Sequence, residues 1–135
     1  MESNKKILII DDDTFLLDMY ALKFSKSGIF DVSASLGPED ALDKLRKGFI
    51  PDVILLDIIM PVMDGFELMQ KMTEEKLALN SIKVVLSNRG DPNDLEKSKK
   101  LGASGYIVKA SNTPSEVLEK IKTIISEQNN LKNGL

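Results

Sequence analysis

The chain has 135 residues, 42% of them hydrophobic and 29% charged, which is the size and composition of a single globular domain. Its net charge of -3 provides no basic surface for nucleic acid or anionic lipid, and no apolar stretch is long enough to cross a bilayer. The sequence contains no cysteine and no histidine, which excludes disulfides, thiolate or imidazole metal sites and a histidine general base.

The first half of the chain alternates apolar runs with segments of helical spacing. A strand is predicted over 7–10, and a helix follows it over about 14–27. A weaker, alternating run over 30–36 predicts an edge strand, and Pro38 suits the first turn of a helix that ends near Lys47. The apolar residues expected on one face of the first helix are Phe15, Leu16, Met19 and Leu22.

In the second half, strands are predicted over 53–56, 82–86 and 106–108. The first of these is an unalternated, β-branched run, which is typical of a strand buried on both faces of a parallel sheet. Helices are expected to follow over about 66–72, 91–100 and 113–128, the last of them opened by a capping box. The sequence therefore predicts one domain over 1–128 and a frayed C-terminal tail over 129–135.

Five strands that alternate with five helices predict an α/β fold. Because crossovers between parallel strands are right-handed, the expected architecture is an open, doubly wound parallel sheet with helices on both faces. The strand order cannot be read from the pattern alone.

Each apolar run ends at a polar residue. Because the carboxyl ends of parallel strands share one edge of the sheet, acidic, hydroxyl and ammonium groups are expected to meet there if the relevant strands are neighbours. The residues that end the five runs are Asp11 with Asp12, Ser35, Asp57, Ser87 and Lys109.

Such a cluster has a specific chemical use. Clustered carboxylates repel one another, and a cation such as Lys109 or a bound divalent metal keeps them ionised. Oxygen ligands in a partly hydrated site suit Mg²⁺. A metal, a lysine and a hydroxyl around one carboxylate can hold a phosphoryl group, whose transfer needs positioning and charge neutralisation more than acid–base catalysis. Asp57 is therefore the predicted nucleophile, which would form an aspartyl-phosphate.

From about residue 5 to residue 127, the sequence resembles the receiver domain of two-component response regulators. The resemblance rests on four motifs in order, ILIIDDD, DVILLDIIMPVMDG, VVLS and GYIVK. It implies a flavodoxin-like sheet with the strand order 2-1-3-4-5. By the same resemblance, Asp57 corresponds to the phosphoacceptor and Asp12 to the direct magnesium ligand. Asp11 corresponds to an acidic partner that acts largely through water, and the backbone carbonyl of Ile59 to a third protein ligand.

The resemblance also assigns residues that respond to the phosphoryl group. Lys109 corresponds to the lysine that pairs with a phosphoryl oxygen, Ser87 to the hydroxyl that contacts it in the active state, and Tyr106 to the aromatic switch residue. Receivers usually carry proline across a cis peptide after the lysine, whereas here Ala110 follows. A cis bond before a non-proline residue costs about 2.5–4 kcal/mol, so a trans peptide in a remodelled loop or a strained cis peptide is expected. Asn88 likewise replaces the small residue common after the hydroxyl.

The implied function is signalling. A sensor histidine kinase or histidine phosphotransfer protein would phosphorylate Asp57 and shift the domain to an active, partner-binding state. The domain would catalyse only its own phosphorylation and dephosphorylation. A downstream protein or an absent output domain is expected on the face of Tyr106 and the last helix, with no direct binding to nucleic acid or membrane. The lack of cysteine and of a signal peptide fits a cytoplasmic location.

Two alternatives stay open. A phosphatase of the haloacid-dehalogenase type also uses a strand-end aspartate, and Asp11 and Asp13 have its spacing, but Phe15 occupies its threonine or valine position. Asp13 is also a good helix N-cap. A degenerate receiver used only for protein interaction is opposed by the complete set of polar strand-end residues. Whether the chain is a stand-alone receiver or a piece of a larger regulator is also open.

Overall fold

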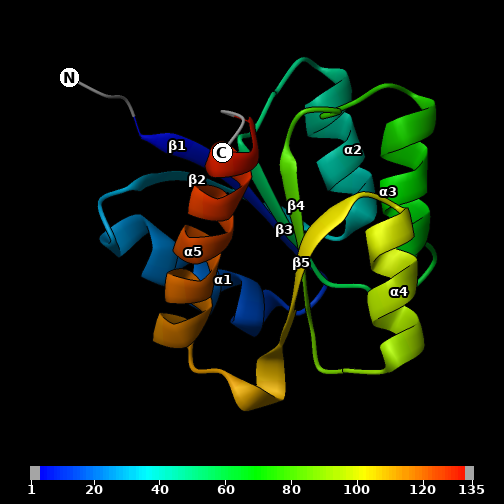
Figure 1. Cartoon of the computed structure of the whole chain (residues 1–135). Coiled ribbons are helices and arrows are strands. Elements are labelled where there is room, and N and C mark those ends of the chain that lie inside the picture. The colour runs from blue at the N-terminus through cyan, green and yellow to red at the C-terminus, as the bar shows by residue number, and fades with distance from the viewer. Residues whose placement is uncertain (1–3, 133–135) are drawn as a thin grey trace.

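The computed structural model describes residues 4–132, within which strands and helices alternate strictly along the chain (Figure 1). The strands are β1 (Lys5–Asp11), β2 (Phe30–Leu36), β3 (Val53–Leu56), β4 (Ile82–Ser87) and β5 (Ala103–Val108). The helices are α1 (Thr14–Lys26), α2 (Pro38–Arg46), α3 (Gly65–Glu74), α4 (Pro92–Lys100) and α5 (Pro114–Lys132), with a short 3-10 helix, η1 (Lys109–Ser111), after β5.

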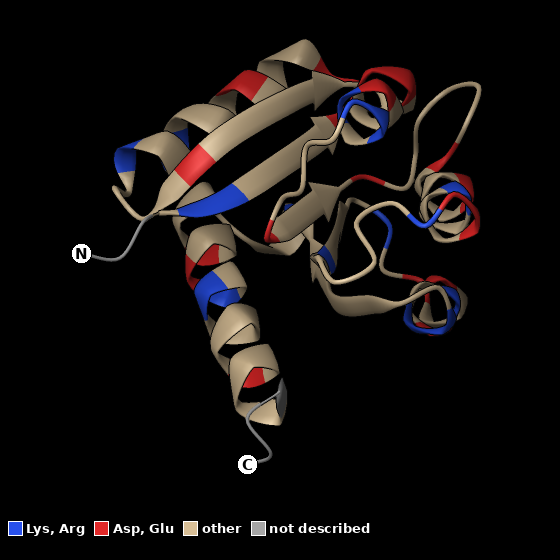
Figure 2. Ribbon diagram, turned by 90° about the horizontal axis from the view of Figure 1, so that it is seen from above, with Lys and Arg blue, Asp and Glu red and all other residues tan. Residues whose placement is uncertain are grey.

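The five described strands form one parallel sheet in the order β2-β1-β3-β4-β5. The predicted doubly wound fold, the order 2-1-3-4-5 and the edge position of β2 are all confirmed. Helices α1 and α5 cover one face of the sheet, and α2, α3 and α4 cover the other (Figures 1 and 2). All strands point the same way, so their carboxyl ends lie along one edge.

Burial on both faces explains the unalternated runs. Along β1, Ile7 and Ile9 face the core under α1 and α5, whereas Leu8 and Ile10 face the core under α2 and α3. All four side chains are at most 2% exposed. Burying a side chain of this size contributes about 1.5–3 kcal/mol, so neither face tolerates a polar residue before the strand ends.

The apolar set expected on one face of α1 is only partly buried. Leu16 and Met19 pack against the core, whereas Phe15 and Leu22 are 76% and 56% exposed. The fully buried residues of the helix are Leu17, Tyr20 and Phe24. Both sets have helical spacing, so periodicity alone does not choose between them. The size of the side chains decides which set is fully buried, because the rings of Tyr20 and Phe24 fill the space beneath the sheet. Phe24 packs on Phe30 of β2, with ring centroids 5.5 Å apart.

The predicted helix starts are confirmed. The Asp13 side chain accepts a hydrogen bond from the backbone N–H of Leu16 at 3.0 Å and caps α1. Thr113 and Glu116 form the capping box that opens α5. Helix α5 includes residues 129–132 of the expected tail, and residues 133–135 lie outside the described part of the chain. None of the helices between residues 4 and 132 is long and apolar enough to cross a membrane.

The loop after β5 takes the first of its two expected forms. The described residues contain no cis peptide bond, so the peptide between Lys109 and Ala110 is trans. The chain turns through η1, and the side-chain amide of Asn112 donates to the carbonyl of Val108 at 2.9 Å.

Candidate functional site

The polar residues predicted at the strand ends lie at one edge of the sheet. Asp11 is the last residue of β1, Asp57 follows β3, Ser87 ends β4 and Lys109 follows β5. The backbone N–H of Asp57 donates to the carbonyl of Ile10 at 3.1 Å, which fixes the end of β3 against β1. The strand order makes β1, β3 and β4 consecutive and places β5 beside β4, as the predicted convergence requires.

Lys109 joins the two buried carboxylates. Its Nζ atom lies 2.7 Å from Oδ2 of Asp11 and 3.0 Å from Oδ2 of Asp57. The side chains of Lys109, Asp11 and Asp57 are only 6%, 4% and 10% exposed. Because solvent screens a buried pair poorly, these contacts are stronger than surface salt bridges. A single ammonium therefore holds the ends of the first and third strands together.

A third carboxylate completes the cluster. Asp11, Asp12 and Asp57 each offer a carboxylate oxygen, and these atoms lie within 4.8 Å of one another. Asp12 is exposed, so the cluster opens to solvent on its side. Three carboxylates and the single ammonium of Lys109 leave two negative charges in excess. The all-oxygen donor set and this charge fit a hard divalent cation.

Backbone N–H groups orient both buried carboxylates. Oδ1 of Asp11 accepts from the N–H of Asp13, and Oδ1 of Asp57 accepts from the N–H of Ile59, each at 3.0 Å. The family resemblance implies a role for the carbonyl of Ile59, and in the structure the N–H of the same residue donates to Asp57. Asp13 caps α1, so it is not the second acid of a phosphatase pair.

The buried pair has shifted pKa values. Burial raises the pKa of Asp11 above its ordinary value of 3.8, although the hydrogen bonds from Lys109 and from the N–H of Asp13 act in the opposite direction. Burial alone would lower the pKa of Lys109, but the hydrogen bond to Asp11 and the charge of Asp57 raise it overall. The lysine therefore stays charged, and the carboxyl of Asp11 is the costly member of the pair.

This cost predicts a pH dependence for the metal-free protein. The folded state holds the Asp11 proton more tightly than the unfolded chain, so its contribution to stability falls as pH rises from 3.8 through the raised pKa. An Asp11→Asn variant lacks this loss, so we expect it to gain stability relative to wild type between pH 4 and pH 7. Urea unfolding in EDTA measures the difference at each pH. A constant difference across this range would contradict the assignment.

Gly65, at the start of α3, lets the loop after β3 pass close to the site. A Cβ atom there would overlap the carbonyl oxygen of Asp57 and would lie 2.7 Å from Cα of Ile58. Both obstacles are backbone atoms, which cannot rotate away as a flexible side chain can.

We expect Gly65→Ala to lower the free energy of unfolding by about 1–3 kcal/mol, the usual cost of overpacking. Urea unfolding measures it. Gly90→Ala is the control, because a Cβ there would meet only a methyl group of Val108, at 3.1 Å. Equal losses in the two variants would show that the close approach of Gly65 to the Asp57 carbonyl is not the cause.

Ser87 and Tyr106 both form hydrogen bonds with the backbone of Arg89. Ser87 is fully buried, and its Oγ accepts from the backbone N–H of Arg89 at 3.3 Å. The half-buried Tyr106 donates its hydroxyl to the carbonyl of the same residue. The guanidinium of Arg89 pairs with Asp94 on α4. The sequence pattern carried no signal for this role of Arg89, because its contacts with Ser87 and Tyr106 are made by its backbone.

A flavodoxin-like sheet with an acidic pocket and a buried lysine at its carboxyl edge defines the class of signalling phosphoacceptor domains. The chain belongs to the response regulator receiver domain family, whose model matches residues 7–122. The resemblance inferred from the motifs is thereby confirmed, and the pocket of Asp11, Asp12 and Asp57 is typical of a phosphoacceptor site. Domains of this family act as signalling phosphoacceptors, not as classical enzymes, and membership implies a histidine kinase as partner.

Relatives of the chain include both longer regulators and single receivers. It is 32% identical over 129 residues to a probable transcriptional regulator, ycf27, of Guillardia theta, an alignment that covers 96% of this chain and 48% of that protein. It is 32% identical over 122 residues to the alkaline phosphatase synthesis transcriptional regulatory protein PhoP of Bacillus subtilis, which covers 90% of this chain and 49% of PhoP. The chain thus spans about half the length of these curated relatives.

A solved receiver has the same fold over nearly its whole length. The CheY-like response regulator receiver domain protein of Methanospirillum hungatei JF-1 superposes with a TM-score of 0.82 and 31% identity, covering 95% of this chain and 98% of that one. The chemotaxis protein CheY of Halobacterium salinarum is 27% identical, over 90% of this chain and 98% of its own length.

Proposed function

We propose that Asp57 accepts a phosphoryl group from the phosphohistidine of a sensor histidine kinase or a histidine phosphotransfer protein, in a Mg²⁺-dependent reaction. One observation carries the proposal. The buried ammonium of Lys109 contacts Asp57 and Asp11 at 3.0 and 2.7 Å, beside a third carboxylate that is open to solvent. This arrangement places a cation beside the carboxylate nucleophile, where phosphoryl oxygens would add negative charge.

The transfer needs no general base. A carboxylate oxygen of Asp57 forms the new O–P bond while the P–N bond of the phosphohistidine breaks, and its electron pair leaves with the donor imidazole. The nucleophile is already ionised, so no proton has to be removed from it. This accounts for a site without histidine. In the proposed reaction, Lys109 neutralises charge on the transferred group and the Ser87 hydroxyl donates to one of its oxygens.

Asp11, Asp12, Asp57 and the backbone carbonyl of Ile59 would hold the Mg²⁺ ion. When bound, the ion neutralises charge on the pocket and on the phosphoryl oxygens. The two excess negative charges of the cluster equal the charge of one divalent cation. The exposed position of Asp12 leaves room for the water ligands that Mg²⁺ usually retains.

The proposed switch runs through Arg89. Its N–H donates to Ser87 and its carbonyl accepts from Tyr106. The two predicted switch residues therefore both bind the backbone of the same residue. If the Ser87 side chain rotates toward the phosphoryl group, its oxygen moves away from the N–H of Arg89, which frees the loop and the tyrosine ring. Phosphorylation would thereby shift a two-state equilibrium of the loop and Tyr106.

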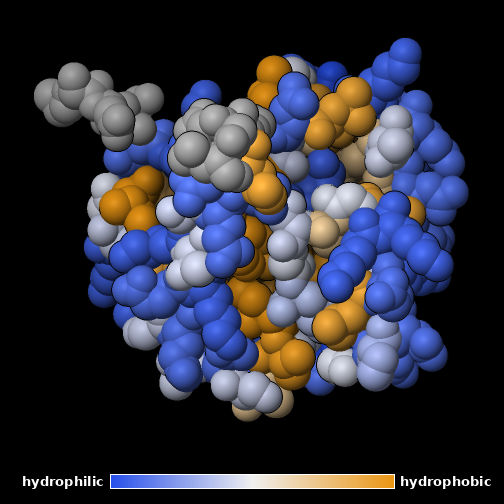
Figure 3. Space-filling view, in the orientation of Figure 1, coloured by the Kyte–Doolittle hydropathy of each residue, from blue (hydrophilic) through white to orange (hydrophobic). Residues whose placement is uncertain are grey.

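We propose that a downstream partner docks on the face formed by β5 and the last helix. Figure 3 shows apolar surface in the strip between the hydrophilic outer sides of α4 and α5. Tyr106, the predicted switch residue, lies on β5. The partner is either a separate protein or an output domain like those of the longer regulators. The proposal places the chain in the cytoplasm, where ATP phosphorylates histidine kinases.

Incubation with acetyl phosphate tests the function without a cognate kinase. With MgCl₂, intact-mass spectrometry should show the addition of one phosphoryl group, labile to hydroxylamine as acyl phosphates are. EDTA should prevent the addition. A chain that takes up no phosphoryl group, or takes it up equally well in EDTA, would contradict the proposal.

A further inference from the structure

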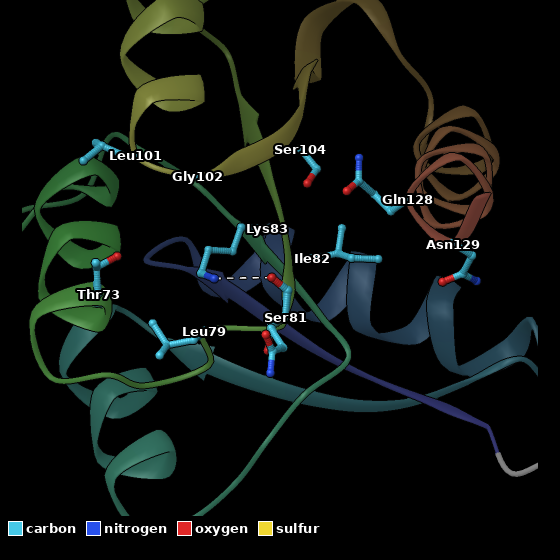
Figure 4. Close-up of a pocket in the computed structure, with 11 residues that line it drawn as sticks. Thr73, Leu79, Ser81, Ile82, Lys83, Leu101, Gly102, Ser104, Gln128 and Asn129 are labelled. Atoms are coloured by element: carbon cyan, nitrogen blue, oxygen red, sulfur yellow. Dashed lines mark hydrogen bonds between the residues drawn. The ribbon is translucent and has the colours of Figure 1, made fainter. Parts of the chain in front are cut away.

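A polar cavity of about 340 Å³ opens at the amino ends of β4 and β5 (Figure 4), at the sheet edge opposite Asp57. It is lined from several directions, by the end of α3, the loop before β4, the first residues of both strands and the last turns of α5. The polar residues that line it include Thr73, Asn80, Lys83, Ser104, Gln128 and Asn129. None of the described residues around the cavity is acidic.

Lys83 is the charged group of this cavity. Its residue is 7% exposed, and Figure 4 shows its ammonium among the labelled side chains. Nζ donates to the carbonyl of Ala78 at 2.8 Å and to that of Ser81 at 3.3 Å. An ammonium has three N–H donors, so these carbonyls leave one donor available. Within residues 4–132, no carboxylate forms a salt bridge with Lys83.

The surroundings favour an anion. A buried ammonium without a counter-charge is costly, and burial lowers the pKa of Lys83 from its ordinary value of 10.5. The hydroxyls of Thr73 and Ser81 already donate to backbone carbonyls, at Met69 and Pro51. The Ser104 hydroxyl and the wall carboxamides of Asn80, Gln128 and Asn129 can donate further hydrogen bonds to oxygen atoms. Among the described residues, the cavity thus combines an available cationic donor with neutral donors and no carboxylate.

We propose that this cavity is a binding site for a small oxyanion, a phosphate or a carboxylate, with Lys83 as its cationic ligand. One oxygen accepts from the ammonium, and the others accept from hydroxyl and amide groups on the walls. The site lies at the far edge of the sheet from the acidic pocket, so binding there is independent of phosphorylation at Asp57. The test must distinguish this binding role from a purely structural one, in which Lys83 only holds the Ala78 carbonyl in place.

Nuclear magnetic resonance titration of the ¹⁵N-labelled chain tests the site. Sodium phosphate and sodium malonate are added separately, without Mg²⁺, and sodium chloride at equal ionic strength is the reference. We expect saturable shifts at the amides of 79–83, 102–104 and 128–129 with at least one oxyanion, and no saturation with chloride. Comparing the two oxyanions tells a phosphate site from a carboxylate site.

Three variants sharpen the result. Lys83→Met should weaken binding about tenfold or more, because it removes a charge-assisted hydrogen bond. Lys26→Met removes an exposed lysine on α1 and should bind as wild type does. Asp57→Asn should also bind unchanged, which excludes the phosphoacceptor pocket as the source of the shifts.

Two results would overturn the proposal. One is the lack of saturable shifts in the wild type with either oxyanion, and the other is unchanged binding in folded Lys83→Met. If Lys83→Met does not fold, Ser104→Leu takes its place, because it fills the cavity from β5 and leaves the carbonyl contacts of Lys83 intact. Unchanged binding in that variant would overturn the proposal equally.

Discussion

The Asp57→Asn variant will take up no phosphoryl group from acetyl phosphate and Mg²⁺, yet it will unfold within about 1 kcal/mol of the wild-type stability. Asparagine has the shape of the carboxylate but not its nucleophilic charge. Its amide oxygen can still accept from the N–H of Ile59 or from Lys109, which keeps its other carboxylate partner, Asp11. The chemistry is thus removed and the fold kept.

Intact-mass spectrometry and urea unfolding check both halves of this expectation. Asp18→Asn is the matched control, because Asp18 is an exposed residue of α1, and it should be phosphorylated as wild type is. Phosphorylation of Asp57→Asn to the wild-type extent would remove Asp57 as the acceptor. Loss of phosphorylation in both variants would show that removing any negative charge has this effect, and not the loss of Asp57 in particular.

Lys109→Met should cost about 3–5 kcal/mol of stability in EDTA, the usual penalty when one partner of a buried ion pair is removed. The variant leaves Asp11 and Asp57 buried, and neither has another salt-bridge partner within residues 4–132. Mg²⁺ should restore part of the lost stability by supplying the missing charge. Phosphoryl uptake should fall as well, since the proposed neutralising group is gone.

Urea unfolding with EDTA and with MgCl₂ gives the two stabilities. The penalty should shrink as pH falls toward 4, because Asp11, whose pKa is raised by burial, takes up a proton and no longer needs the lysine. Lys26→Met again serves as the exposed control. If Lys109→Met matched the wild type in EDTA, the ammonium would not be what compensates the acidic pocket.

The parts of the site that sequence could predict are those set by strand ends. A run such as 53–56, buried on both faces, must stop where the chain meets water, so the first charged residue after it marks the edge of the sheet. This logic found Asp11, Asp57, Ser87 and Lys109 before any resemblance was used. The order of the strands came from the resemblance, because the same alternating pattern is compatible with several orders.

Contacts that depend on backbone atoms or on tertiary packing could not be predicted from the sequence pattern. The buried stripe of α1 depended on aromatic volume beside β2, and two stripes had the same period. The meeting of Ser87 and Tyr106 at Arg89 uses peptide groups, which every residue has. Lys83 lies within a predicted strand, and only the assembled loop before β4 shows it buried against carbonyls.

The ion pairs of Lys109 also bear on the order of events in folding. The lysine lies 98 residues from Asp11 and 52 from Asp57, so no short segment can assemble the pocket on its own. Contacts of such separation carry a large loop-closure cost and tend to form after local structure. A cation that binds the completed pocket should therefore slow unfolding and leave the folding rate nearly unchanged. Occupancy of the acidic pocket would act on the lifetime of the native domain.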